Sequence, residues 1–303
     1  DTTAKLMCGW SREQAATTTI AHLPPMTSVA PWWAALGLAA VIAAGAWRAG
    51  SLRRDGAVTA FVVGASALCA EWSWGSYLIA WFILASVLSR LGRRRKQQRT
   101  AGMVEKSDQR DMRQVLANGG VFALCALLVI TLRLSGHDAL ASAITPQHLA
   151  VVAAGALAAA GADTWATEIG TWIGGTPWSL RTWTPVAPGT SGAITVSGTL
   201  ASAVGALVLA LVAAALSMVP STAIASVAIG GLSGATADTA FGAWVQERRR
   251  CTLCEMDTEQ TVHRCGTRTT YRAGVRAIGN DTVNVLCSVV GGGAAIGWWM
   301  ATT

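Results

Sequence analysis

Charged side chains are scarce in this sequence. They make up 13% of the 303 residues, about half the share that is usual in a soluble domain. Apolar residues make up 52%, and the mean hydropathy is +0.43. This composition excludes a disordered chain, a fibrous protein and an ordinary soluble enzyme. The apolar runs are continuous, whereas strands of a membrane barrel alternate. The fold predicted is therefore all-α, a polytopic transmembrane helical bundle.

Several familiar patterns are also missing. The seven cysteines do not form a disulfide scaffold, because Cys8, Cys69, Cys125 and Cys287 are scattered along the chain. There is no convincing Ser/His/Asp or Cys/His catalytic set, no Walker A sequence and no GxGxxG fingerprint. Candidate chemistry must then come from ionisable residues at the edge of the membrane, where such residues are costly.

The chain contains eight apolar segments, of which several are shorter than the roughly 20 residues that span a bilayer. They cover about 31–47, 57–70, 76–91, 115–134, 148–162, 193–219, 222–245 and 282–300. Segments 57–70 and 148–162 are the weakest, and we expect half-helices or buried helices that continue into polar ends. Residues 1–25 are interpreted as an extension outside the fold. Residues 26–303 form the transmembrane domain, with 247–278 as a polar loop.

Basic residues indicate the orientation. Twenty of the 23 lysines and arginines fall on alternate loops, and therefore on one side of the membrane. The positive-inside rule places that side in the cytoplasm and both termini outside, as for a bacterial inner-membrane protein. The net charge of +7 is thus a topology signal, and no nucleic-acid partner is expected.

Acidic residues recur at this cytoplasmic side. Asp163, Asp238 and Asp281 are each followed by threonine, and Glu168 lies five residues after Asp163. Carboxylates gathered in a partly dry site repel each other unless a cation compensates. Mg²⁺ suits oxygen ligands and often shares them with phosphates. These four residues are therefore the predicted catalytic and Mg²⁺-binding set. The alternative is that they pair with basic residues or cap helices, as Asp163 and Asp281 can at a helix start.

Two segments can bind phosphate. In the first, Gly189, Thr190 and Gly192 precede the apolar segment that begins at residue 193, so that backbone N–H groups and a helix N-terminus face an anion. An ordinary turn with an N-cap is the alternative. In the second segment, Lys106, Arg110 and Arg113 are spaced for one helix face, and the polar residues Gln114 and Asn118 follow them at the membrane entrance. For its basic residues, attraction to lipid headgroups is the alternative.

A cysteine and histidine cluster lies in the polar loop. Cys251 and Cys254 are followed, after eight residues, by His263 and Cys265. Three thiolates and one imidazole match a tetrahedral structural Zn²⁺ site with no open position. Unligated thiols are the alternative.

The acidic segment, residues 161–170 (GADTWATEIG), resembles the signature of the membrane family that contains plant phytyl-phosphate kinase and animal transmembrane protein 19. Other segments agree in the same order: 54–57 with the Trp72 and Trp74 region, 110–120, 188–193, the Asp238 motif and 279–284. The cysteine loop is similar to that of bacterial members. The resemblance covers about residues 26–300.

This resemblance implies an enzyme that phosphorylates a prenyl monophosphate to the diphosphate, with CTP or another nucleoside triphosphate as donor. The partners implied are the prenyl-phosphate lipid and the nucleotide, and Asn280 and Asn284 of the last motif join the predicted substrate-binding residues. Two alternatives remain: a CDP-alcohol-type phosphotransferase, and a non-enzymatic transporter or membrane subunit of a larger complex.

Overall fold

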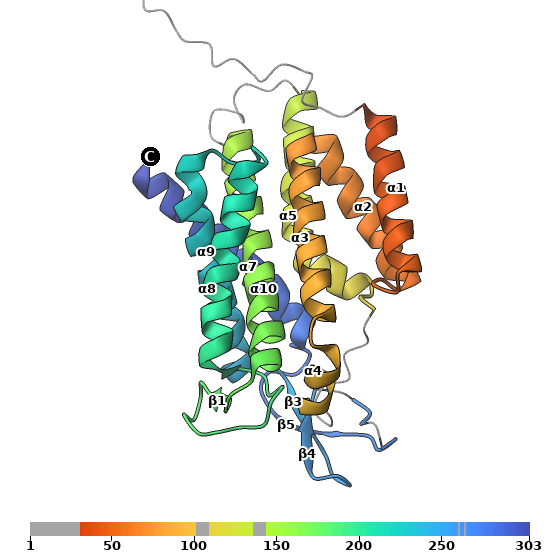
Figure 1. Ribbon diagram of the computed structural model, residues 1–303, viewed down its shortest axis with the longest axis vertical. Coiled ribbons are helices and arrows are strands. Elements are labelled where there is room, and N and C mark those ends of the chain that lie inside the picture. Colours follow the sequence, from red (N-terminus) through yellow and green to blue (C-terminus); the bar gives the residue numbers. More distant parts are fainter. Residues whose placement is uncertain (1–30, 101–108, 136–143, 260, 264) are drawn as a thin grey trace, which may run out of the picture.

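The protein is a bundle of long helices capped at one end by small strands. The computed structural model describes residues 31–100, 109–135 and 144–303, except 260 and 264. In these residues, two groups of four long helices lie side by side (Figure 1). The first group is α1 (Trp32–Arg48), α2 (Arg54–Ala70), α3 (Trp72–Arg90) and α5 (Met112–Ser135). The second is α7 (Pro146–Ile173), α8 (Val196–Ala215), α9 (Ile224–Trp244), entered through the 3-10 turn η2 (Ser221–Ala223), and α10 (Asn280–Thr302). The prediction of a polytopic helical membrane protein is confirmed.

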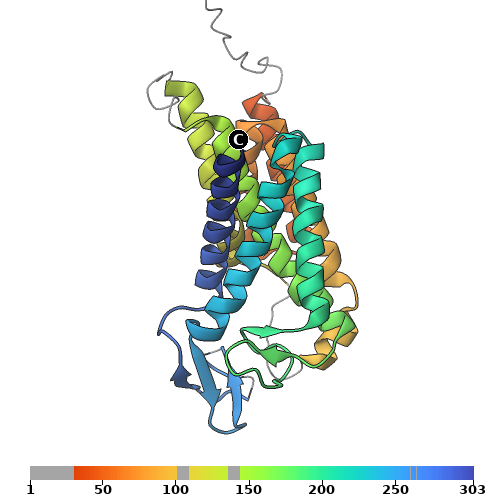
Figure 2. The same cartoon turned by 90° about the vertical axis from the view of Figure 1, so that its left-hand side faces the viewer.

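The bundle has two distinct ends. We call the end with the strands and the short helix α4 (Arg93–Arg99) the loop end, and the opposite end, where α1 begins and α10 finishes, the terminal end (Figures 1 and 2). Five helices among the described residues are long and apolar enough to cross a membrane, namely α3, α5, α7, α8 and α10. Helix α1 is apolar but has only 17 residues.

Helix α7 is a buried helix that continues into a polar end, which is one of the two expectations for segment 148–162. The apolar run ends at Ala162, but the helix continues through the acidic motif to Ile173. It begins with a capping box between Thr145 and His148 and ends at Gly174, whose φ of 86° breaks the helix. Asp163 is therefore inside a helix and is not an N-cap. The end of the apolar run does not mark the end of the helix, because polar residues that follow it have partners on neighbouring elements.

The apolar segment predicted to begin at residue 193 does not begin as a helix. Ala193–Ile194 is a strand, β2, which pairs antiparallel with β1 (Trp178–Ser179). Helix α8 starts only at Val196, and the Thr195 hydroxyl caps it by accepting from the Gly198 N–H at 3.0 Å. Strand β2 thus lies between the glycine turn and the helix.

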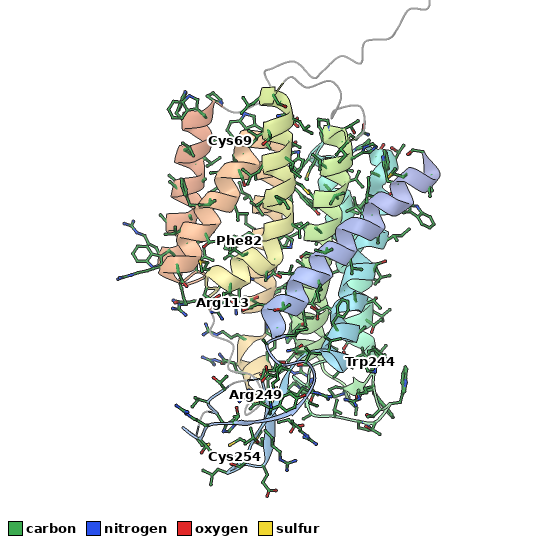
Figure 3. All side chains as sticks on the ribbon, turned by 180° about the vertical axis from the view of Figure 1, so that it is seen from behind. Cys69, Phe82, Arg113, Trp244, Arg249 and Cys254 are labelled. Carbon is green, nitrogen blue, oxygen red and sulfur yellow. The ribbon has the colours of Figure 1, made fainter. Side chains whose placement is uncertain are left out.

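The polar loop 247–278 is folded. It forms a three-stranded antiparallel sheet of β3 (Arg248–Cys251), β4 (Met256–Thr258) and β5 (Thr270–Ala273), with β3 in the centre (Figure 2). The turn between β3 and β4 carries Cys254 (Figure 3).

Candidate functional site at the loop end

Small residues bring α7, α9 and α10 into close contact. A Cβ atom on Gly234 of α9 would lie 2.3 Å from Ala159 Cβ of α7 and 2.6 Å from the carbonyl oxygen of Cys287 of α10. A Cβ on Gly291 would lie 2.5 Å from the same Ala159 Cβ. In a membrane, such small residues let helix backbones approach and pack. The three helices therefore meet at one rigid junction.

Two of the predicted acidic residues lie one helical turn beyond this junction. Asp163 follows Ala159 by four residues and Asp238 follows Gly234 by four, and both helices run toward the loop end. The Cys287 thiol of α10 lies within electrostatic range of both carboxylates. The structure thus places Asp163 and Asp238 near the same point of α10. Two carboxylates in this part of a largely apolar bundle are a donor set that suits a hard divalent cation.

Glu168 leaves α7 on a different side. Five residues correspond to about 500° of helical rotation, so Glu168 points about 140° away from Asp163. Its carboxylate accepts from Lys96 Nζ of α4 at 2.6 Å and from the Ser89 hydroxyl of α3 at 3.0 Å. The pairing alternative therefore describes Glu168 in the structure, and its role as a Mg²⁺ ligand stays a prediction.

Two other cations of α4 also contact α7. Arg99 donates to the carbonyl oxygen of Thr171 at 3.4 Å, and Arg95 donates to that of Ile173 at 3.5 Å. These carbonyls belong to the last turn of α7, where helical partners are missing and the dipole favours cations. This part of the basic run is thus engaged within the protein.

Asp281 lies in the first turn of α10, with Asn280 before it. The charges that act on Asp281 are Asp111 and Arg113, at the start of α5. Asp111 caps α5 by accepting from the Gln114 N–H at 3.0 Å. Asp281 is six residues from Cys287, about 9 Å along the helix axis, with Asn284 between them. It therefore forms a second acidic group nearer the end of the bundle.

Backbone contacts fix the position of Arg110. Its N–H donates to the Ser51 carbonyl at 3.1 Å, and its carbonyl accepts from the Arg53 N–H at 3.0 Å. Gly56 allows this approach, since a Cβ there would lie 2.2 Å from the Arg110 carbonyl oxygen. The guanidinium lies over the Phe82 ring, 5.6 Å from its centroid. Burial lowers the pKa of Arg110, and Glu168 opposes that shift.

The remaining members of this predicted group are spread over several places. Gln114 and Asn118 line the same cavity as Arg110, between α1, α2, α3 and α5. Arg113 instead belongs with Asp281, at the start of α5 (Figure 3). Lys106 lies outside the described residues. The sequence did not indicate this cavity, because the residues between 39 and 82 that line it form no polar motif.

The glycine turn packs against the end of α9. Gly192 has a φ of 71°, and a Cβ there would lie 2.4 Å from the backbone of Ala243. Thr190 donates its hydroxyl to the Ala187 carbonyl at 2.7 Å, and Gly189 has a φ of 90°. The expectation that this turn leads straight into a helix N-terminus is wrong, because Thr195 caps α8 after the hairpin. Phosphate binding by Gly189, Thr190 and Gly192 stays a prediction that rests on the turn alone.

Two arginines near this turn were not singled out as binding residues. Arg248 of β3 is lowered in pKa by burial first and then by the like charge of Arg181, which follows β1. The negative charge of Asp257 raises the pKa of Arg248 and so opposes these two effects in part, but Asp257 also forms an ion pair with Arg272 of β5. Like-charged guanidinium groups held close together favour an anion between them. In the sequence, both arginines counted only toward the positively charged side of the membrane.

The cysteine cluster assembles as predicted. The ligand atoms of Cys251, Cys254, His263 and Cys265 all lie within 4.8 Å of one another. Cys251 and Cys265 Sγ are 3.6 Å apart, and His263 Nδ1 is 3.2 Å from Cys265 Sγ. A tetrahedral zinc with Zn–S bonds of about 2.3 Å requires sulfurs about 3.8 Å apart. The cluster can therefore hold a metal ion.

Comparison with known proteins identifies the family. The family model described as integral membrane protein DUF92 matches residues 37–292. The chain belongs to the DUF92 family. This DUF92 protein is 25% identical over 260 residues to "Protein PGR" of Arabidopsis thaliana. The aligned region covers 82% of this chain and 88% of the plant protein. No solved structure matches it.

Two microbial relatives are also membrane proteins by name. "Uncharacterized membrane protein MJ0933" of Methanocaldococcus jannaschii is 32% identical over 173 residues, 56% of this chain and 64% of that protein. "Uncharacterized membrane protein sll0875" of Synechocystis is 29% identical over 182 residues, 58% of this chain and 65% of that protein. The family match includes every candidate residue from Arg110 to Asn284, so the site belongs to the part of this DUF92 protein that defines the family.

Proposed function

We propose that this DUF92 protein is an integral membrane kinase that transfers the γ-phosphoryl group of CTP, or another nucleoside triphosphate, to a prenyl or phytyl monophosphate. The observation that carries the proposal is that Asp163 of α7 and Asp238 of α9 both lie within electrostatic range of the Cys287 thiol of α10, where three helices meet. Asp163 lies 17 residues along α7, about 26 Å from its start, which is close to the thickness of a hydrocarbon core of about 30 Å. If α7 begins at the outer boundary of the hydrocarbon core, Asp163 lies close to the headgroups of the inner leaflet.

The chemistry needs positioning and neutralisation of charge. An oxygen of the acceptor monophosphate forms a bond to the γ-phosphorus, and the bond from that phosphorus to the β–γ bridging oxygen breaks, giving a nucleoside diphosphate and a lipid diphosphate. The acceptor is already ionised, so no strong base is required. Phosphoryl transfer of this kind depends on electrostatic stabilisation more than on covalent help.

The residues of the chain divide this work. Asp163 and Asp238 would hold Mg²⁺, which when bound neutralises phosphate charge, and Asp281 stands nearby on α10. Arg110, Gln114 and Asn118 bind the acceptor phosphate. Arg181 and Arg248, next to the turn of Gly189 to Gly192, bind the phosphates of the nucleotide.

The proposed function also implies an orientation of the protein in the membrane, and the loop end has a candidate site for a structural metal ion. The loop end faces the cytoplasm, where nucleoside triphosphates are available, and both chain ends face outward. Cys251, Cys254, His263 and Cys265 would hold Zn²⁺, which when bound would stabilise the fold of the three-stranded sheet. The hydrogen bond of the Arg249 Nε–H to the Thr269 hydroxyl, at 2.8 Å, ties two parts of that sheet together.

The test is transfer of label by the purified full chain in lipid nanodiscs, with Mg²⁺ and phytyl, geranylgeranyl or farnesyl monophosphate. We expect label from γ-³²P-CTP or γ-³²P-ATP in a lipid diphosphate. Label from α-³²P-CTP in the lipid would instead indicate a CDP-alcohol-type phosphotransferase. Lipid or solute flux in proteoliposomes without nucleotide, and no label from either donor, would favour a transporter.

A further inference from the structure

An open groove lies on the surface of the first helix group, between α1 and α2. Its volume is about 500 Å³, which is within the range of ligand sites. The residues that line it come from successive turns of the two helices, namely Ala40, Ala43, Ala44 and Trp47 of α1 and Arg54, Ala57, Val58 and Phe61 of α2. Each row covers seven positions, or about 10 Å along a helix. The groove therefore has room for part of an acyl chain.

Small residues on α1 create this groove. Ala40 and Ala44 are exposed alanines between large neighbours, Trp47 on the same helix and Phe61 on α2. The two helices run in opposite directions, at the edge of the bundle (Figure 1). Trp47 and Arg54 therefore lie at the end of the groove nearer the loop end. Arg54 is the one charged residue of the lining, so the groove is apolar along its length and charged at one end.

Positive charge collects at this charged end. The segment that connects the two helices carries three arginines and one acid, namely Arg48, Arg53, Arg54 and Asp55. The acid pairs with Arg53 at 3.5 Å, whereas the exposed side chains of Arg48 and Arg54 have no hydrogen bond or ion pair with another described residue. Guanidinium groups suit phosphate oxygens, and exposed tryptophans such as Trp47 favour the level of lipid headgroups.

Neighbouring helices hold the connecting segment in place. Arg90, at the end of α3, donates to the Ser51 hydroxyl at 2.9 Å and to the Ala49 carbonyl at 3.4 Å. The Arg53 N–H donates to the carbonyl of Arg110, just before α5, at 3.0 Å. A further guanidinium thus stands beside the same segment, and the charged end of the groove has a fixed position. Helix α1 itself packs mainly on α2.

We propose that the groove binds an anionic phospholipid of the bilayer, with its phosphate at Arg54 and one acyl chain along Ala44 and Phe61. The apolar walls are complementary to the chain, and the unpaired positive charge is complementary to the headgroup. The bound lipid stabilises the contact of α1 with α2. None of the residues assigned to phosphoryl transfer lines the groove, so this site does not depend on the proposed function.

The experiment is photo-crosslinking of the purified full chain in phosphatidylcholine nanodiscs. The probe is a trace of phosphatidylglycerol with a diazirine on one acyl chain, and labelled peptides are mapped by mass spectrometry. We expect label on α1 and α2 around Ala44 and Phe61. Unlabelled phosphatidylglycerol in the bilayer should displace this label, whereas the zwitterionic phosphatidylethanolamine should not.

Two matched pairs of variants separate recognition of the headgroup from recognition of the chain. Arg54→Gln should lower labelling by about fivefold, or about 1 kcal/mol, whereas Arg94→Gln, which changes an exposed arginine of α4, should leave it unchanged. Ala44→Phe fills the groove and should lower labelling by a similar factor. Gly45→Phe is its control, because Gly45 is the next residue of α1, does not line the groove and has open space around its Cβ position.

Other results would overturn the proposal. Label spread evenly over the outer helices, or confined to α8 and α9, would show that the groove holds no particular lipid. Equal loss of label in Arg54→Gln and Arg94→Gln would mean a general attraction of the basic side for anionic lipids. Equal displacement by phosphatidylethanolamine would mean that the headgroup charge is not recognised. The wild-type map needs no variant, so misfolding of a phenylalanine variant does not decide the outcome.

Discussion

At the scale of single residues, the local environment gives ionisable groups of one motif different neighbours. Glu168 and Asp163 belong to one motif, yet Glu168 forms an ion pair with Lys96, whereas Asp163 lies within electrostatic range of Cys287 on α10. The sequence identified both as candidates, because residue type and proximity in the chain do not show the direction of a side chain. Only the rotation of the helix and the position of α4, a helix rich in arginine, separate their roles.

The ion pair of Lys96 with Glu168 should stabilise the contact of α4 with α7. Their side chains are only 10% and 16% exposed, so removing one charge leaves the other with little water. We expect Lys96→Met and Glu168→Gln each to lower the free energy of unfolding by about 1–3 kcal/mol, and the double variant by less than the sum. Thermal unfolding in detergent measures this. Additive effects would show that the two groups do not interact.

The thiols of the metal cluster should differ in reactivity once metal is removed. Hydrogen bonds with Thr267 and His263 lower the pKa of Cys265 to about 6, whereas a hydrogen bond with Cys265 raises the pKa of Cys254 to about 11. A lowered thiol pKa favours the folded state at high pH, and this contribution declines as the pH falls from about 9 toward about 6. In chelated protein we therefore expect alkylation of Cys265 by iodoacetamide at pH 7 and of Cys254 only at much higher pH. Zinc-loaded protein should be protected at both thiols, and equal rates with and without zinc would contradict the metal site.

At the scale of elements, apolar patterning predicted the eight long helices but not all their ends. Segments 115–134 and 282–300 fall within α5 and α10 and miss each end by three residues or fewer. The apolar run ends at Ala162, 11 residues before the end of α7, and the helix continues through Asp163 and Glu168, as the expectation of a buried helix with a polar end allows. The β1 and β2 hairpin was missed since strands of two residues carry no periodic signal.

The junction of α7, α9 and α10 should depend on its glycines. A methyl group on Gly291 would meet Ala159 Cβ at 2.5 Å and the Gly155 carbonyl at 2.9 Å, while Gly293, on the same helix, has open space. We expect Gly291→Ala to destabilise the fold by about 1–3 kcal/mol and Gly293→Ala to be neutral or slightly stabilising. Thermal unfolding of the two variants gives the comparison. Equal melting temperatures would mean that the three helices are not tightly packed.

At the scale of the whole molecule, the two ends differ in charge and in polarity. The strands, the metal cluster and α4 all lie at the loop end, and the start of α1 and the end of α10 lie at the other (Figure 1). The charge pattern in the sequence predicts that division. Helix packing, the cavity and the grouping of Asp163 with Asp238 required coordinates, because they depend on contacts between residues far apart in the chain.

This division predicts the sidedness of the protein in a cell. In variants with a single cysteine, we expect Thr303→Cys to react with a membrane-impermeant maleimide in intact cells, and Cys254 to react only after permeabilisation. The positive-inside rule gives the direction, since the arginines gather at the loop end. Labelling of Cys254 in intact cells would reverse the orientation and place the carboxylate pair away from cytoplasmic nucleotide.

The proposed kinase requires that Asp163 and Asp238 together bind one divalent cation. The direct measurement is Mn²⁺ binding, followed by electron paramagnetic resonance, to purified full chain with a non-hydrolysable CTP analogue. We expect one site in the wild type, and affinity lower by about tenfold or more in both Asp163→Asn and Asp238→Asn, since each removes a charged oxygen ligand. Asp55→Asn, an exposed acid at the start of α2, is the control and should bind as the wild type does. Unchanged Mn²⁺ affinity in both junction variants would contradict the account.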